Sequence, residues 1–248
     1  MDSLNLKIIA RIKSDFPEKF GIPRQSGLVP SLRSTIRFEP EFRNADALRG
    51  LEGFSHLWLI WIFSENVRGT WHPTVRPPRL GGNTRLGVFA TRSSFRPNPI
   101  AMSCVKIEDV RMDGPEGPEI IVSGADLMDG TPIVDIKPYL PYADSVPEAK
   151  GGFAEARRYD CLQVEIAPEI ARLVPEGKFD ALVEILRQDP RPHYQDDPER
   201  IYGLSFASKN IKFKVAGNTL TVIAVEQKIP GANNHPGHIL IQISFWLI

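Results

Sequence analysis

The chain has 248 residues, 42% of them hydrophobic, and its 30 basic residues balance 30 acidic ones. A chain of this size and composition can bury a substantial core, which excludes an intrinsically disordered protein. The zero net charge gives no general attraction to nucleic acid or to a membrane surface, so a charged binding site has to come from local clustering.

The first half, residues 1–150, predicts a mainly β domain. Short segments rich in β-branched and aromatic residues alternate with Pro- and Gly-containing turns, as in an all-β sandwich or barrel, and closure into a barrel would remove exposed strand edges. The nearly continuous apolar run HLWLIWIF at 56–63 indicates a strand covered on both faces, by the barrel or by a partner subunit. The expected strands are 4–12, 35–42, 56–63, 85–91, 102–110, 119–124 and 132–139.

The second half, residues 151–248, predicts a small α+β domain. Residues 178–189 carry apolar side chains at the i, i+3, i+4, i+7 spacing of an amphipathic helix, which the prolines of DPRP end. The tail from Gln227 onward is apolar and atypical, and an added strand, a dimer contact and an unpaired end all remain open. The apolar helix residues are Phe179, Leu182, Val183 and Leu186, and the expected strands are 159–167, 203–208, 210–215 and 220–225.

Neither cysteine has the sequence spacing of a metal site. Cys104 and Cys161 lie in apolar runs without a CxxC or Cys/His pattern, so we expect buried thiols and no bound metal. The N-terminus lacks the pattern of a secretory signal, which favours a cytoplasmic protein. No apolar stretch is long enough for a membrane-spanning helix.

Positive charge is concentrated in one block of the first half. No Asp or Glu occurs between Asn66 and Ile107, whereas Lys and Arg recur there. In ATRSSFRPNP, Arg92 and Arg96 lie on backbone that prolines stiffen, and a rigidly held guanidinium loses little entropy when it binds an anion. The block therefore favours an anion or carboxylate site, with a solvated loop of incidental arginines as the alternative.

Three further segments place polar groups on constrained backbone. PRQSG presents a guanidinium and an amide after a proline, and DLMDG carries two carboxylates that either accept hydrogen bonds from a ligand or set up a turn. QDPRPHY combines cations with an aromatic ring, which suits an unpaired base and its phosphate. Asp135 lies inside a predicted strand, where it needs a partner such as Lys137 or a catalytic function.

In this order, these segments resemble the TsaA-like family, whose bacterial members are called TrmO. The motifs that carry the resemblance are PRQSGL, LRGLEGFSHLWLIWIF, TVRPPRLGGNTRLGVFATRSSFRPNPIAMS, DLMDGTPIVDIKPYLPYAD and LRQDPRP. The resemblance implies a methyltransferase that uses S-adenosyl-L-methionine (SAM) and acts on the exocyclic N6 nitrogen of threonylcarbamoyladenosine in tRNA, beside the anticodon. It also implies a β-barrel unlike the Rossmann fold, and a homodimer with SAM near the subunit interface. The absence of a GxGxxG or Walker A motif agrees with this.

The same resemblance implies which residues form the SAM pocket. Many relatives carry a histidine at the position of Ser64, so this chain lacks whatever that imidazole does. The implied SAM-binding residues are Pro23, Arg24, Gln25, Ser64, Glu65, Arg92, Met102, Asp126, Leu127, Met128 and Asp129.

The acceptor nitrogen is amide-like, so its methylation calls for a base or for hydrogen bonds that stabilise its deprotonated form. The sequence does not rank the candidates for this role, which are Asp126, Asp129, Asp135 and Tyr139. Contacts to tRNA are expected from Arg76, Arg79, Arg96, Arg191, His193 and Tyr194. Two other functions stay open, a SAM-dependent enzyme with a different substrate and a non-catalytic SAM- or RNA-binding module.

Overall fold

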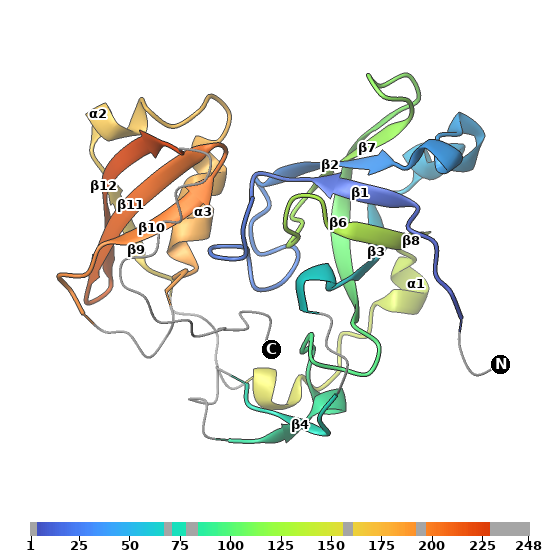
Figure 1. The fold of residues 1–248 in the computed structure, drawn as a ribbon, viewed down its shortest axis with the longest axis horizontal. Helices are drawn as coiled ribbons and strands as arrows, with labels where there is room; N and C mark the ends of the chain where they lie inside the picture. The colour runs from blue at the N-terminus through green and yellow to red at the C-terminus, as the bar shows by residue number, and fades with distance from the viewer. Residues whose placement is uncertain (1–3, 67–70, 78–83, 156–160, 192–196, 229–248) are drawn as a thin grey trace.

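A computed structural model describes residues 4–66, 71–77, 84–155, 161–191 and 197–228. The first half forms a closed six-strand β-barrel, and the second half forms a four-stranded sheet flanked by helices (Figure 1). These two units confirm the fold class that the sequence predicts. In the described part of the chain, no helix has the length and apolar character needed to span a membrane.

The barrel consists of antiparallel neighbours in the order β1-β2-β7-β6-β3-β8. Along β3, alternate residues point inward, so Leu57, Leu59 and Trp61 are buried while the residues between them lie half-buried on the outer face. This alternation is what lets one strand fill the barrel interior. The strands are β1 Ala10–Lys13, β2 Arg33–Phe38, β3 His56–Ile62, β6 Ile100–Arg111, β7 Glu119–Ser123 and β8 Pro132–Pro138.

The strand predicted at 85–91 is mostly wrong. Only β5, Leu86–Gly87, pairs with the short strand β4, Thr74–Val75, and Val88–Ala90 forms the 3₁₀ helix η6. The backbone N–H of Val88 donates to the carbonyl of Pro73 at 2.9 Å and closes the hairpin, and the N–H of Thr91 donates to the carbonyl of Val88 at 3.2 Å in the 3₁₀ turn that follows. The other 3₁₀ helices are η1 Pro40–Phe42, η2 Ala45–Leu48, η3 Leu51–Gly53, η4 Ser64–Asn66 and η7 Gly152–Ala154.

The second half is a sheet in the order β10-β11-β12-β9, in which β12 and β9 are parallel. Helix α3, Phe179–Arg187, confirms the predicted amphipathic helix and buries Leu182, Ile185 and Leu186. Phe179, expected on the buried face, is 41% exposed because it is the first residue of the helix. The other elements are α1 Pro141–Asp144, α2 Pro168–Ala171, β9 Gln163–Ile166, β10 Tyr202–Phe206, β11 Lys209–Ala216 and β12 Thr219–Gln227.

The cysteines are less buried than predicted. Cys161 is exposed just before β9, and Cys104 is half-buried on the outer face of β6 opposite Trp58. The alternation of side chains along a strand turns Cys104 outward, whereas Cys161 lies before the first residue of its strand. Among the described residues, no cluster of His, Cys, Asp and Glu is placed to hold a metal ion.

The loop between β1 and β2, residues 14–32, joins the two halves. Its residues Phe16, Val29 and Leu32 belong to the hydrophobic core of the C-terminal sheet, and the rings of Phe16 and Phe206 lie 5.4 Å apart. In Figure 1 this loop, in blue, occupies the space between the barrel and the sheet. The PRQSG segment is therefore held by both halves of the molecule.

Candidate functional site

A buried carboxylate lies at the centre of the candidate site. Asp126 is 5% exposed, and its Oδ1 accepts a hydrogen bond of 2.6 Å from the hydroxyl of Ser103. That hydroxyl in turn accepts a 3.0 Å hydrogen bond from the indole Nε1 of Trp61. Trp61 and Ser103 point into the barrel from the neighbouring strands β3 and β6, so an otherwise apolar interior carries a short polar chain that ends at Asp126.

The environment of Asp126 changes its acidity. Burial raises the pKa of Asp126 from its ordinary 3.8 to about 6, and the Ser103 hydrogen bond, the positive charge of Arg92 and the backbone N–H of Ser26 partly oppose this shift. A carboxyl group with such a pKa changes protonation state close to neutral pH, which suits a proton acceptor.

Gln25 and Arg92 lie beside this carboxylate. Arg92 Nη1 donates to Gln25 Oε1 at 2.5 Å, although the two residues are 67 positions apart. The Gln25 amide Nε2 donates to the carbonyl of Arg24 at 2.6 Å, which fixes the amide orientation. The structure thus brings together Gln25, Arg92 and Asp126 from three of the predicted motifs.

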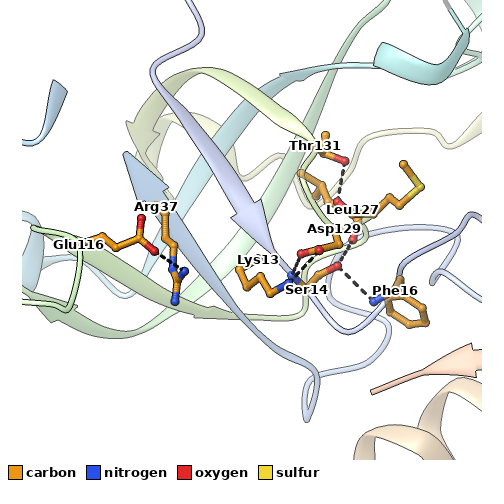
Figure 2. Close-up of polar contacts among 9 residues, drawn as sticks. Lys13, Ser14, Phe16, Arg37, Glu116, Leu127, Asp129 and Thr131 are labelled. Atoms are coloured by element: carbon orange, nitrogen blue, oxygen red, sulfur yellow. Dashed lines mark hydrogen bonds and ion pairs between the residues drawn. The ribbon is translucent and has the colours of Figure 1, made fainter. Parts of the chain in front are cut away.

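The DLMDG loop is fastened to the end of β1, as Figure 2 shows. The Asp129 carboxylate accepts hydrogen bonds from Lys13 Nζ and from the backbone N–H of Ser14, both at 2.9 Å. The hydroxyl of Ser14 donates to the carbonyl of Leu127 at 3.0 Å. Asp129 and Leu127 therefore fix the loop, and each carboxylate oxygen of Asp129 accepts one of these hydrogen bonds.

Ser64, Glu65 and Met128 line one shared cavity, together with Trp61 and Lys19. Burial lowers the pKa of Lys19, and the negative charge of Glu65 partly opposes this change. The residues that follow β3 therefore meet the DLMDG loop at this cavity.

Pro23 and Arg24 line a neighbouring cavity on the junction between the two halves. Arg24 Nη2 donates to the backbone carbonyl of Asp189 at 3.0 Å, and burial lowers the pKa of Arg24. Lys19 lines this cavity as well as the one beside Ser64, so the two cavities meet at its side chain.

Arg191 is not displayed to solvent as an RNA-binding residue would be. Its Nε and Nη2 atoms contact the two carboxylate oxygens of Asp189 at 2.9 and 3.0 Å, and its side chain is 11% exposed. The pair instead supports the turn whose carbonyl binds Arg24. His193 and Tyr194, predicted beside it, lie outside the described residues, as does Arg79.

Three of the predicted residues face away from the barrel interior, into which Ser103, the hydrogen-bond partner of Asp126, points. Asp135 pairs with Lys137 at 2.9 Å. Tyr139 packs against Trp58 near the start of β3. Ser64 follows the other end of this strand, about 20 Å from Trp58 at roughly 3.3 Å per residue. Met102 lies on the outer face of the barrel, opposite Ile60.

Of the remaining predicted arginines, Arg76 is exposed at the end of β4. Arg96 donates from Nη1 to the carbonyl of Thr91 at 3.1 Å, so it holds the basic loop in shape. Arg92 and Arg96 thus have different environments despite their proximity in sequence.

Sequence reasoning did not identify Lys19, Trp61 and Ser103. Ser103 had one available signal, since it is a polar residue at an inward position of an apolar strand. Lys19 carried no such signal, because its role comes from a contact with residues far along the chain.

Comparison with known proteins identifies the family of this chain. Residues 11–145 match the model of the tRNA-methyltransferase O N-terminal domain, and residues 160–228 match that of the TrmO C-terminal domain. A protein of Escherichia coli (strain K12) named tRNA (adenine(37)-N6)-methyltransferase is 42% identical over 236 residues, which cover 92% of this chain and 100% of the relative.

Two relatives come from Pseudomonas aeruginosa. One, named putative S-adenosylmethionine-dependent methyltransferase RcsF, is 45% identical over 204 residues, which cover 79% of this chain and 86% of the relative. The other is a crystal structure of TrmO, which superposes with a TM-score of 0.75 at 34% identity and covers 92% of this chain and 99% of its own. The chain therefore belongs to the tRNA-methyltransferase O family.

Proposed function

We propose that this protein transfers a methyl group from SAM to the N6 nitrogen of threonylcarbamoyladenosine at position 37 of tRNA. Family membership and the name of the E. coli relative, a tRNA (adenine(37)-N6)-methyltransferase, support the reaction and the position in tRNA. The observation in the structure that carries the proposal is the buried Asp126 beside Gln25 and Arg92.

The polar groups around Asp126 fit SAM. The Arg92 guanidinium is held by Gln25 and keeps further N–H donors for the ligand carboxylate. The cavity lined by Ser64, Glu65 and Met128 offers apolar and polar atoms for the rest of the molecule. When bound, SAM supplies an electrophilic methyl group on a sulfonium.

Asp126 is the base that the geometry favours. In the transfer, the N6–H proton passes to the Asp126 carboxylate while the N6–methyl bond forms and the sulfur–methyl bond breaks, which releases S-adenosylhomocysteine. A pKa of about 6 leaves Asp126 mostly ionised at neutral pH yet able to hold a proton. Asp135 and Tyr139 are less suited in a single chain, because they lie against outward-facing residues of β3.

We further propose a division of labour between residues 1–150, as the catalytic domain, and residues 151–248, as a tRNA-recognition domain. Arg76 and Arg79 would contact phosphates of tRNA, whose substrate base would enter from the exposed anticodon loop. The half-buried outer face of β3 and the exposed Ile100 and Met102 support a homodimer that places Met102 near the SAM of the partner. Substrate and cofactor both suggest the cytoplasm.

Incubation of the purified protein with labelled SAM and tRNA from a strain that lacks this modification tests the proposal. Nucleosides from the digested tRNA are then analysed by mass spectrometry, and we expect the threonylcarbamoyladenosine peak to gain one methyl group. Methylation of a different substrate would replace the proposed one. SAM binding without transfer would instead make the protein a binding module, for which Ser64 in place of the family histidine is the sequence argument.

A further inference from the structure

Two large aromatic side chains stay exposed to solvent on the β4–β5 hairpin. Trp71 is 49% and Phe89 is 73% exposed, and their ring centroids lie 6.2 Å apart with an interplanar angle of 31°. Trp71 precedes β4 and Phe89 lies in η6, directly after β5, so the rings come from opposite arms of the hairpin. We call this pair the aromatic platform.

The exposure of the platform is built into the hairpin. Val75 and Val88 point to the interior and are 9% and 1% exposed, and the hydrogen bond from Val88 to Pro73 closes the hairpin beside them. Phe89, next to Val88, is consequently directed outward. The hairpin lies at the lower edge of Figure 1, away from the C-terminal sheet. Two contacting aromatic rings at a surface mark a binding site more strongly than a single exposed ring does.

The charge around the platform indicates the kind of partner. Arg76 and Arg85 are exposed on the same hairpin, and Arg85 Nη1 contacts only the hydroxyl of Thr74, at 3.4 Å, among the described hydrogen bonds. The sequence from Asn66 to Ile107 contains no carboxylate to neutralise them. Aromatic faces beside uncompensated cations suit a polyanion with flat, unpaired bases, whereas an apolar protein partner would have to desolvate the arginines without compensation.

We propose that the aromatic platform stacks unpaired bases of the tRNA anticodon loop while Arg76 and Arg85 contact the adjoining phosphates. The inference rests on the proposed function for the identity of the RNA. Phe89 is three residues before Arg92, whose guanidinium contacts Gln25, so at most about 10 Å of backbone separates Phe89 from the residue proposed to bind the SAM carboxylate. Bases next to the modified adenosine therefore reach the platform while that adenosine occupies the site.

The test compares binding of a labelled anticodon stem-loop RNA to full-length variants by fluorescence anisotropy. Phe89→Ala should weaken binding roughly 5- to 150-fold, the range for loss of one stacked base, while Phe89→Trp should bind like the wild type. Tyr142→Ala is the matched control, because Tyr142 is an exposed aromatic residue on α1 and is 87% exposed. Arg85→Gln should reduce the slope of log affinity against log salt by about 1.

Normal stem-loop binding by Phe89→Ala would overturn the inference. A loss confined to SAM affinity or to dimerisation would also overturn it, because Phe89 would then contact the cofactor or a second copy of the chain. This test can fail or succeed independently of the test of the proposed function. A wild type that binds the stem-loop through Phe89 but methylates no tRNA leaves the platform intact. If Phe89→Ala methylates tRNA as well as the wild type does, the platform has no role in tRNA binding, and the proposed function still holds.

Discussion

The hydroxyl of Ser103, which points into the barrel interior, donates a 2.6 Å hydrogen bond to the carboxylate of Asp126. Ser103 is 1% exposed and also accepts from Trp61, so both of its hydrogen-bonding directions are fixed. A neutral donor in this position stabilises the ionised form of Asp126 against the effect of burial. The proton affinity of the proposed base thus depends first on its burial and then on the hydrogen bond from a buried serine.

Ser103→Ala should raise the pKa of Asp126. A hydrogen bond to a charged group contributes about 1.5–3 kcal/mol, so the acidic limb of the kcat/KM profile should move up by about 1–2 pH units. The profile is measured with tRNA and SAM across neutral pH. Ser123→Ala is the control, because Ser123 is also buried but binds Glu108. An equal loss of rate at every pH would give Ser103 a purely structural role.

Asp126→Asn should remove methyl transfer and change the pH dependence of stability. The pKa of Asp126 is raised to about 6, so folding favours its protonated form. The free energy of unfolding of the wild type should therefore fall as pH rises from about 4 to about 6. The difference in free energy of unfolding between the variant and the wild type should therefore shift in favour of the variant by about 1–3 kcal/mol from pH 4 to pH 8. Urea denaturation at both pH values measures this gain, and the half-exposed Asp135→Asn should show little of it.

Arg92→Lys should weaken SAM binding more than tRNA binding. Lysine cannot reproduce the planar fork that contacts Gln25 and a ligand carboxylate together, so the KM for SAM should rise about 10- to 100-fold. Arg96→Lys serves as the neighbour control, since Arg96 contacts only the Thr91 carbonyl among the described hydrogen bonds. It should lower the melting temperature with little change in that KM. Equal effects of the two substitutions would contradict the separate roles.

Gly21→Ala should destabilise the junction between the two halves. A Cβ at Gly21 would lie 2.1 Å from Leu204 Cδ1, and the backbone φ of +87° already disfavours alanine. Together these effects should cost about 2–4 kcal/mol, measured by chemical denaturation. Gly27→Ala is the matched control, because Gly27 has a φ of +80° but nothing within 4 Å. A similar loss in both variants would show that backbone strain alone is responsible.

Ile100→Lys should convert the proposed dimer into a monomer. Ile100 lies opposite Ile62 on the outer apolar face of the barrel and is 38% exposed, so a lysine would place a charge within the interface. Met112→Lys is the control, since Met112 is 40% exposed but follows the other end of β6. Light scattering measures the molar mass of both variants. An unchanged mass for Ile100→Lys would show that the interface lies elsewhere or does not exist.

The elements and motifs that depend on neighbouring residues were predictable from the sequence. The apolar spacing of Leu182 and Leu186 predicted α3, and the apolar run at 56–63 predicted β3. The basic block and the DLMDG loop were recognised by residue type and order. The predicted strand at 85–91 was mostly wrong, because its backbone hydrogen bonds go to Pro73 and to a 3₁₀ turn rather than to a long partner strand.

The sequence by itself determined the family, the two units and the set of candidate residues, since each of these follows from local patterns and from motif order. Only the tertiary structure decided which candidates meet. Gln25 and Arg92, 67 positions apart, come into contact because the β1–β2 loop is held in the core of the C-terminal sheet. Ser103 and Asp126 meet because the closed barrel turns Ser103 of β6 inward and the loop between β7 and β8 buries Asp126 beside it. Pairing between distant strands determines this contact, and local spacing does not.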